Sequence, residues 1–492
     1  MWNQADLQRL VKEKLSDYLF VVVSNREPYI HTYTGDKIEC ILPASGLTTA
    51  LDPVMRACGG TWVAHGSGSA DKEVVDSNNS VLVPPESGSY KLRRVWLSDE
   101  EVDKYYLGFS NEAMWPLCHI VFQRPKFDDE DWYTYKKVNR LFADAVLEEI
   151  GHQKAFVFIQ DYHLTLVSRL IKAKNPRVIT AQFWHIPWPN REAFRVCPWQ
   201  NEILYGLLGN DLLGFHIAYH RHNFLETVDR ALECRIDNEK FSVTHGNHTT
   251  YVKPFPISVD FDSIAERSQA AEVEEEMIAI KSKYNITDEI IGIGLDRIDY
   301  TKGIPERLKA IDALLTKYPK YKHKNRITFF QLGEPSRVKI QKYEELNIEI
   351  DRLVADINSR HQTDSWQPII YIKEHKSPVT LLAFNRLARF CIVSSLHDGM
   401  NLVAKEFISS RTDEDGILIL SRFTGAAREL DEALLVNPYA IEDIAETIQA
   451  AIEMPDDLRR KRMIKLRNIV RENNVYRWAA DIITELVRIE SI

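Results

Sequence analysis

Residues 389–408 read R-F-C-I-V-S-S-L-H-D-G-M-N-L-V-A-K-E-F-I, and they hold the strand–turn–helix unit from which the rest of the chain can be interpreted. The apolar run 390–393 predicts a strand, and the run 402–408 predicts a helix. The turn between them therefore offers unpaired backbone N–H groups at the positive end of a helix dipole, which suits an anion. Asp398 and Glu406 add acceptors for hydroxyl groups. The pattern fits a sugar-nucleotide site and fits an ordinary capped helix equally well.

Short β-branched runs alternate with longer helical patterns along the whole chain, which predicts an α/β fold with parallel sheets. The expected strands are residues 20–24, 155–159, 178–183, 212–215, 290–294, 327–331, 369–372, 390–393, 417–420 and 433–436. Charge-rich helices are expected within 262–284 and 457–472. Two prolines within 253–257 favour extended backbone, and we place the boundary between two halves there. Two such halves imply a cleft, with ligands beyond the carboxyl ends of the strands.

The composition narrows the class of protein. With 492 residues, 45% apolar and 27% charged, the chain has the make-up of a two-domain globular protein, and its net charge of −9 argues against a general nucleic-acid or membrane binder. No apolar run approaches the roughly 18 residues of a membrane span, and the N-terminus lacks the order of a signal peptide. The six cysteines are scattered without a C-x-x-C pair, so we expect no zinc site, no disulfide framework and a cytoplasmic location.

Basic residues follow several predicted strands. Arg297 and Lys302 lie five residues apart after the strand 290–294 and could hold a diphosphate, although Arg297 could equally be a surface arginine. Arg297 also stands where a dinucleotide fingerprint needs its third glycine, which argues against a nucleotide-dependent dehydrogenase. Arg26 and Arg337 follow strands in different halves and could close on one phosphate, or each could pair with a local carboxylate.

Asp161 and His185 are the candidates for proton transfer and hydroxyl binding, because each directly follows a predicted strand of the first half. His185 could instead be a packed structural histidine among Trp184, Trp188 and two prolines. A nucleophilic triad is not indicated, since the chain has no G-x-S-x-G elbow. The acidic run 127–131 is interpreted as a solvated helix start and not as a metal site.

These segments together resemble the trehalose-6-phosphate synthase family of retaining glycosyltransferases, from about residue 19 to 488. The motifs that carry the resemblance are S-N-R (24–26), Y-Y-x-G-F-S-N (105–111), M-W-P (114–116), D-Y-H-L (161–164), H-I-P-W-P (185–189), L-L-G-x-D-L-L-G-F-H (207–216), D-R-I-D-Y-T-K-G-I-P-E-R (296–307), P-S-R (335–337), D-G-M-N-L-V-A-K-E (398–406), S-R-F-T-G-A-A (421–427) and N-P-Y (437–439).

The resemblance implies a GT-B fold, in which two Rossmann-like doubly wound domains face a central cleft and a C-terminal helix crosses back to the N-terminal domain. Residues 1–255, with the helix at about 474–492, would bind the acceptor, and residues 256–473 would bind the nucleotide-sugar donor. Glucose would pass from a nucleoside-diphosphate glucose such as UDP-glucose to glucose 6-phosphate with retention, giving α,α-trehalose 6-phosphate. No metal or other cofactor would be required. The partners would be these small molecules, with a homo-oligomer left open.

The resemblance also carries roles to matching positions. Asp161, His185, Arg297 and Lys302 would be catalytic, with Arg297 and Lys302 on the diphosphate. The donor would be held by Gly46, His185, Arg297, Lys302, Asp398, Gly399, Met400, Asn401, Leu402, Val403 and Glu406, where Glu406 would bind the ribose and Asp398 and His185 would bind sugar hydroxyls. The acceptor would be held by Arg26, Tyr106, Trp115, Asp161 and Arg337, with both arginines on its phosphate.

Three positions depart from the family pattern. Ser45 replaces a glycine of the donor loop, Gln160 replaces the histidine before D-Y-H, and His397 replaces an arginine before D-G-M-N. Relatives that make glucosylglycerol phosphate, and pseudo-glycosyltransferases that join a nucleotide-cyclitol to an amino-cyclitol phosphate, share the scaffold and stay open as alternatives. A non-catalytic sensor would be expected to lose Asp161, His185 or the basic pair, so an enzyme is favoured. The nucleotide base, the acceptor and any regulation stay open.

Overall fold

The computed structural model describes residues 1–43, 46–323 and 325–491. The chain divides into two compact units, of which unit 1 comprises Met1–Ile257 with Val475–Ile492 and unit 2 comprises Ser258–Asn474. Ser45, which replaces a glycine of the predicted donor loop, lies outside the described residues. Within the described parts, no helix combines the length and the apolar character that crossing a membrane would require.

Unit 1 is built on one sheet, which has ten strands within the described residues, in the order β10-β11-β12-β9-β8-β7-β1-β4-β6-β5. The strands are β1 Leu19–Arg26, β4 Thr61–His65, β5 Ser80–Val83, β6 Tyr90–Val95, β7 Ala155–Gln160, β8 Ile179–Phe183, β9 Leu212–Phe215, β10 Arg235–Asp237, β11 Ser242–His245 and β12 His248–Pro254. The seven from β12 to β6 pair in parallel with one another. The antiparallel pairs among the described strands lie at the two edges, where β10 pairs with β11, β11 with β12, and β5 with β6. A separate hairpin pairs β2 Ile30–Thr34 with β3 Lys37–Ile41. From β1 the chain builds the sheet outwards first on one side and then on the other, so the strand order reverses between β1 and β7.

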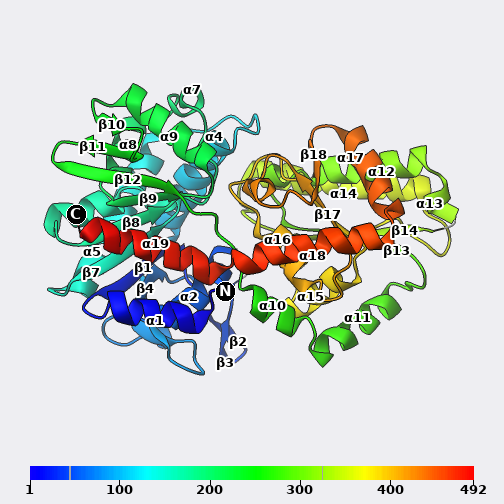
Figure 1. Ribbon diagram of the computed structural model, residues 1–492, viewed down its shortest axis with the longest axis horizontal. Helices are drawn as coiled ribbons and strands as arrows, with labels where there is room; N and C mark the ends of the chain where they lie inside the picture. Colours follow the sequence, from blue (N-terminus) through cyan, green and yellow to red (C-terminus); the bar gives the residue numbers. More distant parts are fainter. Residues whose placement is uncertain (44–45, 324, 492) are drawn as a thin grey trace. The chain divides into compact units, whose positions relative to one another are not determined.

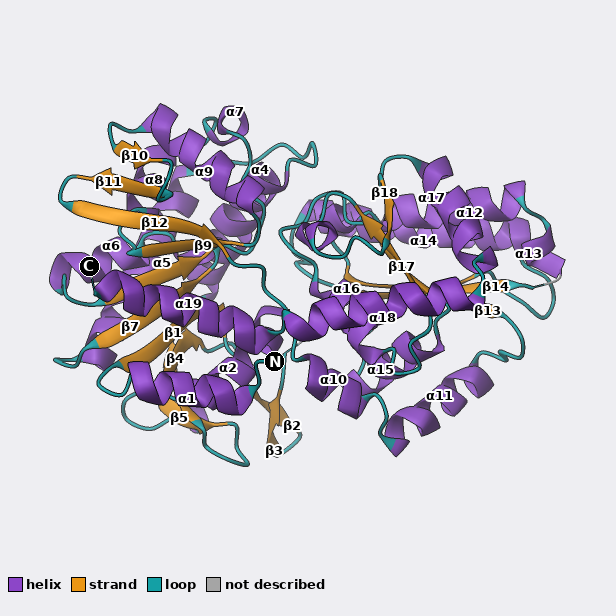
Figure 2. Ribbon diagram, viewed as in Figure 1, coloured by secondary structure: helices purple, strands orange, loops and turns teal. Residues whose placement is uncertain are grey.

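Helices cover both faces of this sheet (Figure 2). They are α1 Gln4–Lys14, α2 Gly46–Cys58, α3 Asp99–Glu101, α4 Trp115–His119, α5 Asp129–Ile150, α6 Val167–Lys174, α7 Arg191–Phe194, α8 Gln200–Leu207, α9 Ala218–Ala231 and α19 Val475–Glu490, with 3-10 turns η1 Asp71–Glu73 and η3 Tyr162–Leu164 and a π-helix η2 Val102–Met114. The acidic run begins α5 as expected, because the Asp128 carboxylate accepts hydrogen bonds from the Glu130 and Asp131 N–H groups.

The last helix, α19, packs on unit 1 although the chain enters it from unit 2. It lies beside α1 and α2, where Figure 1 draws it in red. The indole N–H of Trp478 donates to the Phe255 carbonyl at 3.2 Å, and its ring packs 5.2 Å from that of Phe183. Lys253 and Glu485 add an ion pair at 2.7 Å. The apolar face of an amphipathic helix is thereby buried, which fastens the end of the chain to unit 1.

Unit 2 contains a sheet that, within the described residues, has six strands, all parallel, in the order β15-β14-β13-β16-β17-β18. The strands are β13 Ile290–Arg297, β14 Ile327–Glu334, β15 Ile369–Ile372, β16 Phe390–Val393, β17 Ile417–Ser421 and β18 Leu434–Val436. The helices are α10 Phe261–Arg267, α11 Ala271–Lys283, α12 Ile304–Lys317, α13 Lys320–His323, α14 Gln341–His361, α15 Pro378–Leu387, α16 Leu402–Ser410, α17 Ile441–Glu453 and α18 Asp456–Glu472, with 3-10 turns η4 Tyr300–Lys302 and η5 Gly425–Arg428. The strand order is that of a dinucleotide-binding fold and reverses between β13 and β16.

The strands expected from the sequence are confirmed, and the charge-rich stretch 262–284 proves to be two helices, α10 and α11. Strands β2 to β6 and β10 to β12 were not expected from the sequence. Strand β6, Y-K-L-R-R-V, shows why: its charged residues hide a strand whose Arg94 points into the core.

Arg94 is the centre of a buried charge cluster in unit 1. Its Nε donates to Glu27 at 2.8 Å, and its Nη2 lies 2.8 Å from both Asp71 Oδ1 and His31 Nδ1. Burial raises the pKa of Glu27 to about 8, helped by its hydrogen bond to Asp71. Burial opposes ionisation of Asp71 too, but hydrogen bonds from His31 and Glu27 outweigh it and lower the pKa of Asp71. Two carboxyl groups thus share one proton and one cation, which keeps the cluster close to neutral.

Replacing Arg94 with methionine is expected to destabilise unit 1 by about 3–5 kcal/mol, because it leaves two buried carboxyl groups without their cation. Urea unfolding followed by tryptophan fluorescence suits this measurement, since all tryptophans except Trp366 belong to unit 1. The matched control is Arg195→Met, in an exposed pair with Glu192 at 2.8 Å, which should change stability by at most about 1 kcal/mol. Equal shifts for the two variants would contradict a structural role for the cluster.

Candidate active site

In unit 2, the turn between β16 and α16 is shaped by Asn401. This residue has φ 98°, outside the regions that most side chains adopt, and its side-chain oxygen accepts the Ala404 N–H at 3.0 Å. One N–H of the first turn is capped in this way. Leu402 and Val403 are the first two residues of the helix, so their N–H groups have no acceptor within it. These N–H groups therefore point outward from the helix start. The predicted anion-binding turn is therefore present as local geometry.

Asp398 gathers three donors on one oxygen. Its Oδ2 accepts from Lys302 Nζ at 2.5 Å, and from Ser395 Oγ and Asn401 Nδ2 at 3.2 Å each. Lys302 ends η4, which follows β13, whereas Asp398 follows β16. The ion pair thus spans the two strands between which the order of the sheet reverses. Both side chains keep some exposure, 13% for Lys302 and 15% for Asp398.

Two close backbone approaches hold this turn in place. Gly303, with φ 61°, would bring a Cβ within 2.2 Å of the Ser394 carbonyl oxygen. A Cβ on Gly425 would come within 2.0 Å of the Gly399 carbonyl oxygen, and the Gly425 N–H donates to the Asp398 carbonyl at 3.1 Å. Any larger residue at either glycine would push the turn away from its neighbours.

Glu406 lies in the second turn of α16 and is partly buried. Burial raises the pKa of Glu406 to about 6. The neighbouring Lys405 does not neutralise it, because Lys405 is buried against Glu429 with Nζ 2.7 Å from a carboxylate oxygen. A carboxyl group with two acceptor oxygens thus follows the anion-binding turn on the same helix, at the place where a diol could bind.

Arg297 ends β13, and Arg337 follows β14 with φ 50°. Arg337 Nη1 donates to Asp299 at 3.1 Å and to the Tyr343 hydroxyl at 2.5 Å. Burial opposes ionisation of Asp299, but the nearby arginines lower the pKa of its carboxyl. For Arg337, pairing with a local carboxylate is therefore what the structure shows. The predicted clamp with Arg26 joins residues of different units and stays a prediction.

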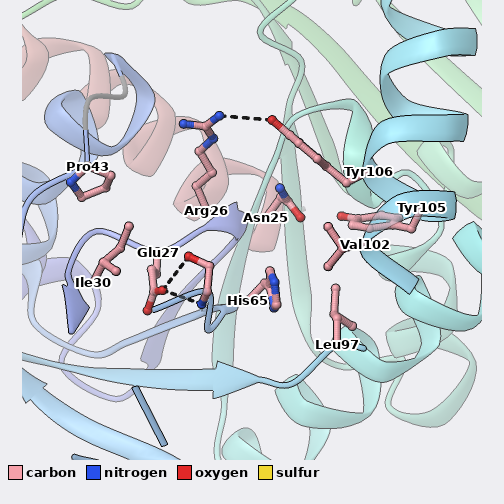
Figure 3. Close-up of a pocket in the computed structure, with 11 residues that line it drawn as sticks. Asn25, Arg26, Glu27, Ile30, Pro43, His65, Leu97, Val102, Tyr105 and Tyr106 are labelled. Carbon is pink, nitrogen blue, oxygen red and sulfur yellow. Dashed lines mark hydrogen bonds between the residues drawn. The ribbon is translucent and has the colours of Figure 1, made fainter. Parts of the chain in front are cut away.

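In unit 1, Arg26 ends β1 and its Nη2 donates to the Tyr106 hydroxyl at 3.1 Å (Figure 3). Tyr106 belongs to the π-helix η2 and stacks on the His163 ring with centroids 5.7 Å apart. The two side chains border a pocket of about 220 Å³, which is lined by Asn25, Arg26, Glu27, Ile30, Pro43, His65, Ser67, Leu97, Val102, Tyr105 and Tyr106. Two of the predicted acceptor-binding residues are thus brought together.

Asp161 and His185 are also brought together. Asp161 follows β7 with φ 69° and ψ 178°, and its Oδ1 accepts the backbone N–H of His185 at 3.1 Å. Gln182 donates to the Asp161 carbonyl at 3.0 Å. A strained non-glycine backbone that its neighbours hold in place is common at functional sites. Burial lowers the pKa of His185 to about 3, so its imidazole is neutral.

The remaining predicted residues are placed as follows. Trp115 begins α4, and its ring lies 5.9 Å from that of Tyr162, next to Asp161 in the chain. Gly46 begins α2 of unit 1, whereas the predicted donor residues from Arg297 to Glu406 belong to unit 2. Gly399 and Met400 lie within the turn, where the Met400 carbonyl accepts the Ala426 N–H at 3.0 Å.

Several residues that support the site were not singled out from the sequence. Asp299 and Tyr343 orient Arg337, and Ser395 supports Asp398. Arg307 lies at the end of the motif D-R-I-D-Y-T-K-G-I-P-E-R, so the resemblance could have indicated it. Tyr343 belongs to a separate helix and carries no local signal. Across the described ranges, no group of three or more histidine, cysteine, aspartate or glutamate side chains is arranged to hold a metal ion.

Comparison with known proteins places this geometry in a family. The sequence model of glycosyltransferase family 20 matches residues 18–488. A trehalose-6-phosphate synthase from Mycobacterium marinum is 36% identical over 483 residues, covering 96% of this chain and 95% of the relative. An α,α-trehalose-phosphate synthase (UDP-forming) from Burkholderia xenovorans, solved in complex with glucose-6-phosphate, has a TM-score of 0.85 and 29% identity over 95% of this chain and 99% of its own. A structure from E. coli bound with UDP-2-fluoro glucose has a TM-score of 0.84 and 28% identity, with 95% and 99% covered.

The predicted fold class, GT-B with two Rossmann-like units, is confirmed by these structural matches. The predicted resemblance is confirmed as well, since the family match spans nearly the whole chain. The chain belongs to glycosyltransferase family 20 and is a glycosyltransferase.

Proposed function

We propose that this enzyme transfers glucose, with retention of anomeric configuration, from a nucleoside-diphosphate glucose to glucose 6-phosphate and forms α,α-trehalose 6-phosphate. The observation that carries the proposal is the Lys302–Asp398 pair beside the start of α16, at the point where the strand order of unit 2 reverses. A phosphate group and a sugar hydroxyl are the two partners that this pair would take together. The relative that binds UDP-2-fluoro glucose supports UDP-glucose as the first donor to test.

The donor would be held by unit 2. Arg297 and Lys302 would hold the diphosphate, with the N–H groups of the turn 399–403 completing its ligands. Asp398 would accept from hydroxyls of the transferred glucose, and Glu406 would accept from the ribose diol. All of these residues belong to β13, to β16 or to the segments that directly follow them.

The acceptor would be held chiefly by unit 1. Arg26 and Tyr106 would bind the phosphate, with Trp115 beside them, and Asp161 would orient the acceptor sugar. Arg337 would add a second guanidinium to the phosphate and Gly46 would contact the donor. The Burkholderia xenovorans relative, which holds glucose-6-phosphate, supports this acceptor.

The chemistry needs no nucleophile from the protein. The acceptor oxygen would attack the anomeric carbon as the bond to the diphosphate breaks on the same face, and the hydroxyl proton would pass to the departing phosphate oxygen. The main task of the protein is then to stabilise negative charge on the leaving group. Arg297 and Lys302 supply two positive charges there, so we propose that turnover requires no metal and persists in the presence of a chelator.

The test is product formation from glucose 6-phosphate with UDP-, GDP- and ADP-glucose in parallel, followed by mass spectrometry and anomeric NMR. An α,α-1,1-linked disaccharide phosphate would support the proposal and identify the preferred nucleotide. Binding of the substrates without product would contradict it and favour coupling of a nucleotide-cyclitol to an amino-cyclitol phosphate. Product with glycerol 3-phosphate alone would favour a glucosylglycerol-phosphate synthase.

Replacing Lys302 with methionine should lower kcat/KM about 10²- to 10³-fold, because it removes one of two cations from the leaving diphosphate. The matched control is Lys309→Met on α12, where Nζ lies 3.8 Å from Glu349 in an exposed pair. That variant should keep wild-type kinetics. Similar losses in both variants would contradict a specific role for Lys302.

Binding of the nucleoside diphosphate should tighten as the pH rises through about 6, the pKa of Glu406, because only the ionised carboxylate can accept from both ribose hydroxyls. Isothermal titration calorimetry with the wild type and Glu406→Gln separates this effect from titration of the ligand's own phosphate, which is common to both proteins. The difference between the two affinity profiles should grow above about pH 6. Parallel profiles would contradict a role for the Glu406 carboxylate in the nucleotide site.

Stability of unit 2 should respond to pH in the opposite direction. The pKa of Glu406 is raised from 4.5 in the unfolded chain to about 6 in the fold, so folding favours the protonated form. This contribution is fully present below the unfolded pKa and is lost as the pH rises through the folded one. Thermal melting of the wild type and Glu406→Gln should therefore diverge between about pH 4.5 and 6 and run parallel above it.

A further inference from the structure

The proposed donor, acceptor and proton-transfer roles do not use the contact between Gln160 and His185. Gln160 ends β7 and is fully buried, whereas His185 follows the neighbouring strand β8 and is only partly buried. The two strands pair in parallel, with Gln160 opposite Phe183, so the two side chains meet at the carboxyl edge of the sheet. Gln160 Oε1 lies 2.9 Å from His185 Nε2.

The orientation of the Gln160 amide follows from its second contact. Its Nε2 lies 3.3 Å from the Phe158 carbonyl oxygen, which can only accept a hydrogen bond. The NH₂ group must therefore face Phe158, and the amide oxygen must face His185. An amide oxygen cannot donate, so His185 Nε2 carries the proton and donates it to Gln160.

The other groups around His185 leave this assignment undisturbed. Asp161 Oδ1 accepts the backbone N–H of His185 at 3.1 Å. His216 Nε2 donates to the His185 carbonyl at 3.1 Å, and the two rings lie 5.3 Å apart in a T-shaped arrangement. Phe183 packs on the ring with centroids 4.7 Å apart. Within the described residues, none of these contacts takes His185 Nδ1.

We propose that Gln160 is a positioning residue, which holds His185 as the neutral tautomer protonated at Nε2 and so presents Nδ1 as a hydrogen-bond acceptor to a hydroxyl of the transferred sugar. Only the identity of that hydroxyl rests on the proposed function. The effect of burial on the pKa of His185 agrees, since an imidazole with a pKa of about 3 stays neutral in any ordinary assay.

The choice of glutamine at this position has a chemical consequence. A histidine at position 160 could donate or accept, so the proton between two imidazoles could lie on either ring. A glutamine whose NH₂ group is already used can only accept. The residue at position 160 therefore determines whether His185 Nδ1 is a hydrogen-bond acceptor or a donor toward the sugar hydroxyl. The wrong tautomer would leave both His185 Nδ1 and that hydroxyl without a hydrogen bond.

Nitrogen NMR of the unliganded protein, labelled with ¹⁵N-histidine, tests the tautomer directly. The His185 signals can be assigned by their loss in His185→Asn. Nε2 should resonate as a protonated nitrogen and Nδ1 as an unprotonated one, unchanged between about pH 5.5 and 8.5. A proton on Nδ1, or titration within this range, would overturn the proposal whether or not the enzyme makes the proposed product.

Substitution of Gln160 then tests whether this residue fixes the tautomer of His185. In Gln160→Leu, in which the side chain has a similar volume, the Nε2–H group of His185 loses its acceptor. The NMR signals of His185 should therefore shift toward a mixture of tautomers. The value of kcat should fall about three- to tenfold, the equivalent of one neutral hydrogen bond, with KM for the acceptor unchanged. Wild-type tautomer and kcat in this variant would overturn the proposal.

Gln160→Glu provides a second test, which holds even if the fold does not accept a leucine at position 160. The carboxylate still accepts from Nε2 but raises the pKa of His185, because it favours the imidazolium. Imidazolium carries a proton on both nitrogens, so kcat at saturating donor, where the protonation of Glu406 no longer limits binding, should fall at low pH in a limb that the wild type lacks. A control in the neighbouring strand β8 is Thr180→Val, which removes the buried Ser168–Thr180 hydrogen bond of 2.8 Å and should leave the tautomer and the pH profile unchanged. A pH profile of Gln160→Glu that matches the wild type would contradict the proposal.

Discussion

The reversal of strand order is the constraint on which the candidate site depends. In each unit the chain lays its first long strand in the middle of the sheet and then adds strands on one side before the other. The segments that leave the two central strands must turn to opposite faces, so the backbone opens at that point of the carboxyl edge. In unit 1, Arg26 is the last residue of one central strand and Asp161 follows the other. In unit 2, Lys302 and Asp398 follow the two central strands. Residues distant in sequence become neighbours because the topology brings their strand ends together.

Where the backbone opens at the carboxyl edge of a sheet, polar backbone and side-chain groups need hydrogen-bond partners. In unit 2, Arg307 provides such hydrogen bonds. Its guanidinium is fully buried and donates to Asp296 at 2.6 Å, to Gln331 at 3.1 Å and to Ser394 at 3.0 Å. Asp296 lies near the end of β13, Gln331 lies within β14, and Ser394 directly follows β16. One rigid, planar cation thus links three neighbouring strands, which a flexible ammonium group could not do with the same geometry. The Lys302 loop and the Asp398 turn are held at a constant separation as a result.

The sequence predicted this framework well because strands, helix starts and glycine-bearing turns have local signatures. The run 390–393 is apolar throughout, as expected of a strand buried on both faces. The strained backbone of Asp161, at φ 69°, has no such signature, since it is imposed by Gln182 and His185 from the next strand. Strand β6 was missed for a related reason: Arg94 is tolerated inside only because Glu27 and Asp71 meet it there, and neither is close in sequence. The partner of a buried charge is a tertiary property, and no local pattern contains it.

Two ion pairs of unit 2 bear on how it would discriminate among ligands if it binds the donor as proposed. Lys302 is paired with Asp398 and Arg337 with Asp299, so the charges of these two cations are compensated in the structure. A phosphate alone that drew Lys302 away would leave Asp398 partly buried and short of its strongest donor, which is costly. A sugar nucleotide would supply both replacements at once, a phosphate for Lys302 and a hydroxyl for Asp398. Because a ligand must replace both partners of the Lys302–Asp398 pair, a ligand with a phosphate and a hydroxyl at the right spacing would bind better than one with a phosphate alone.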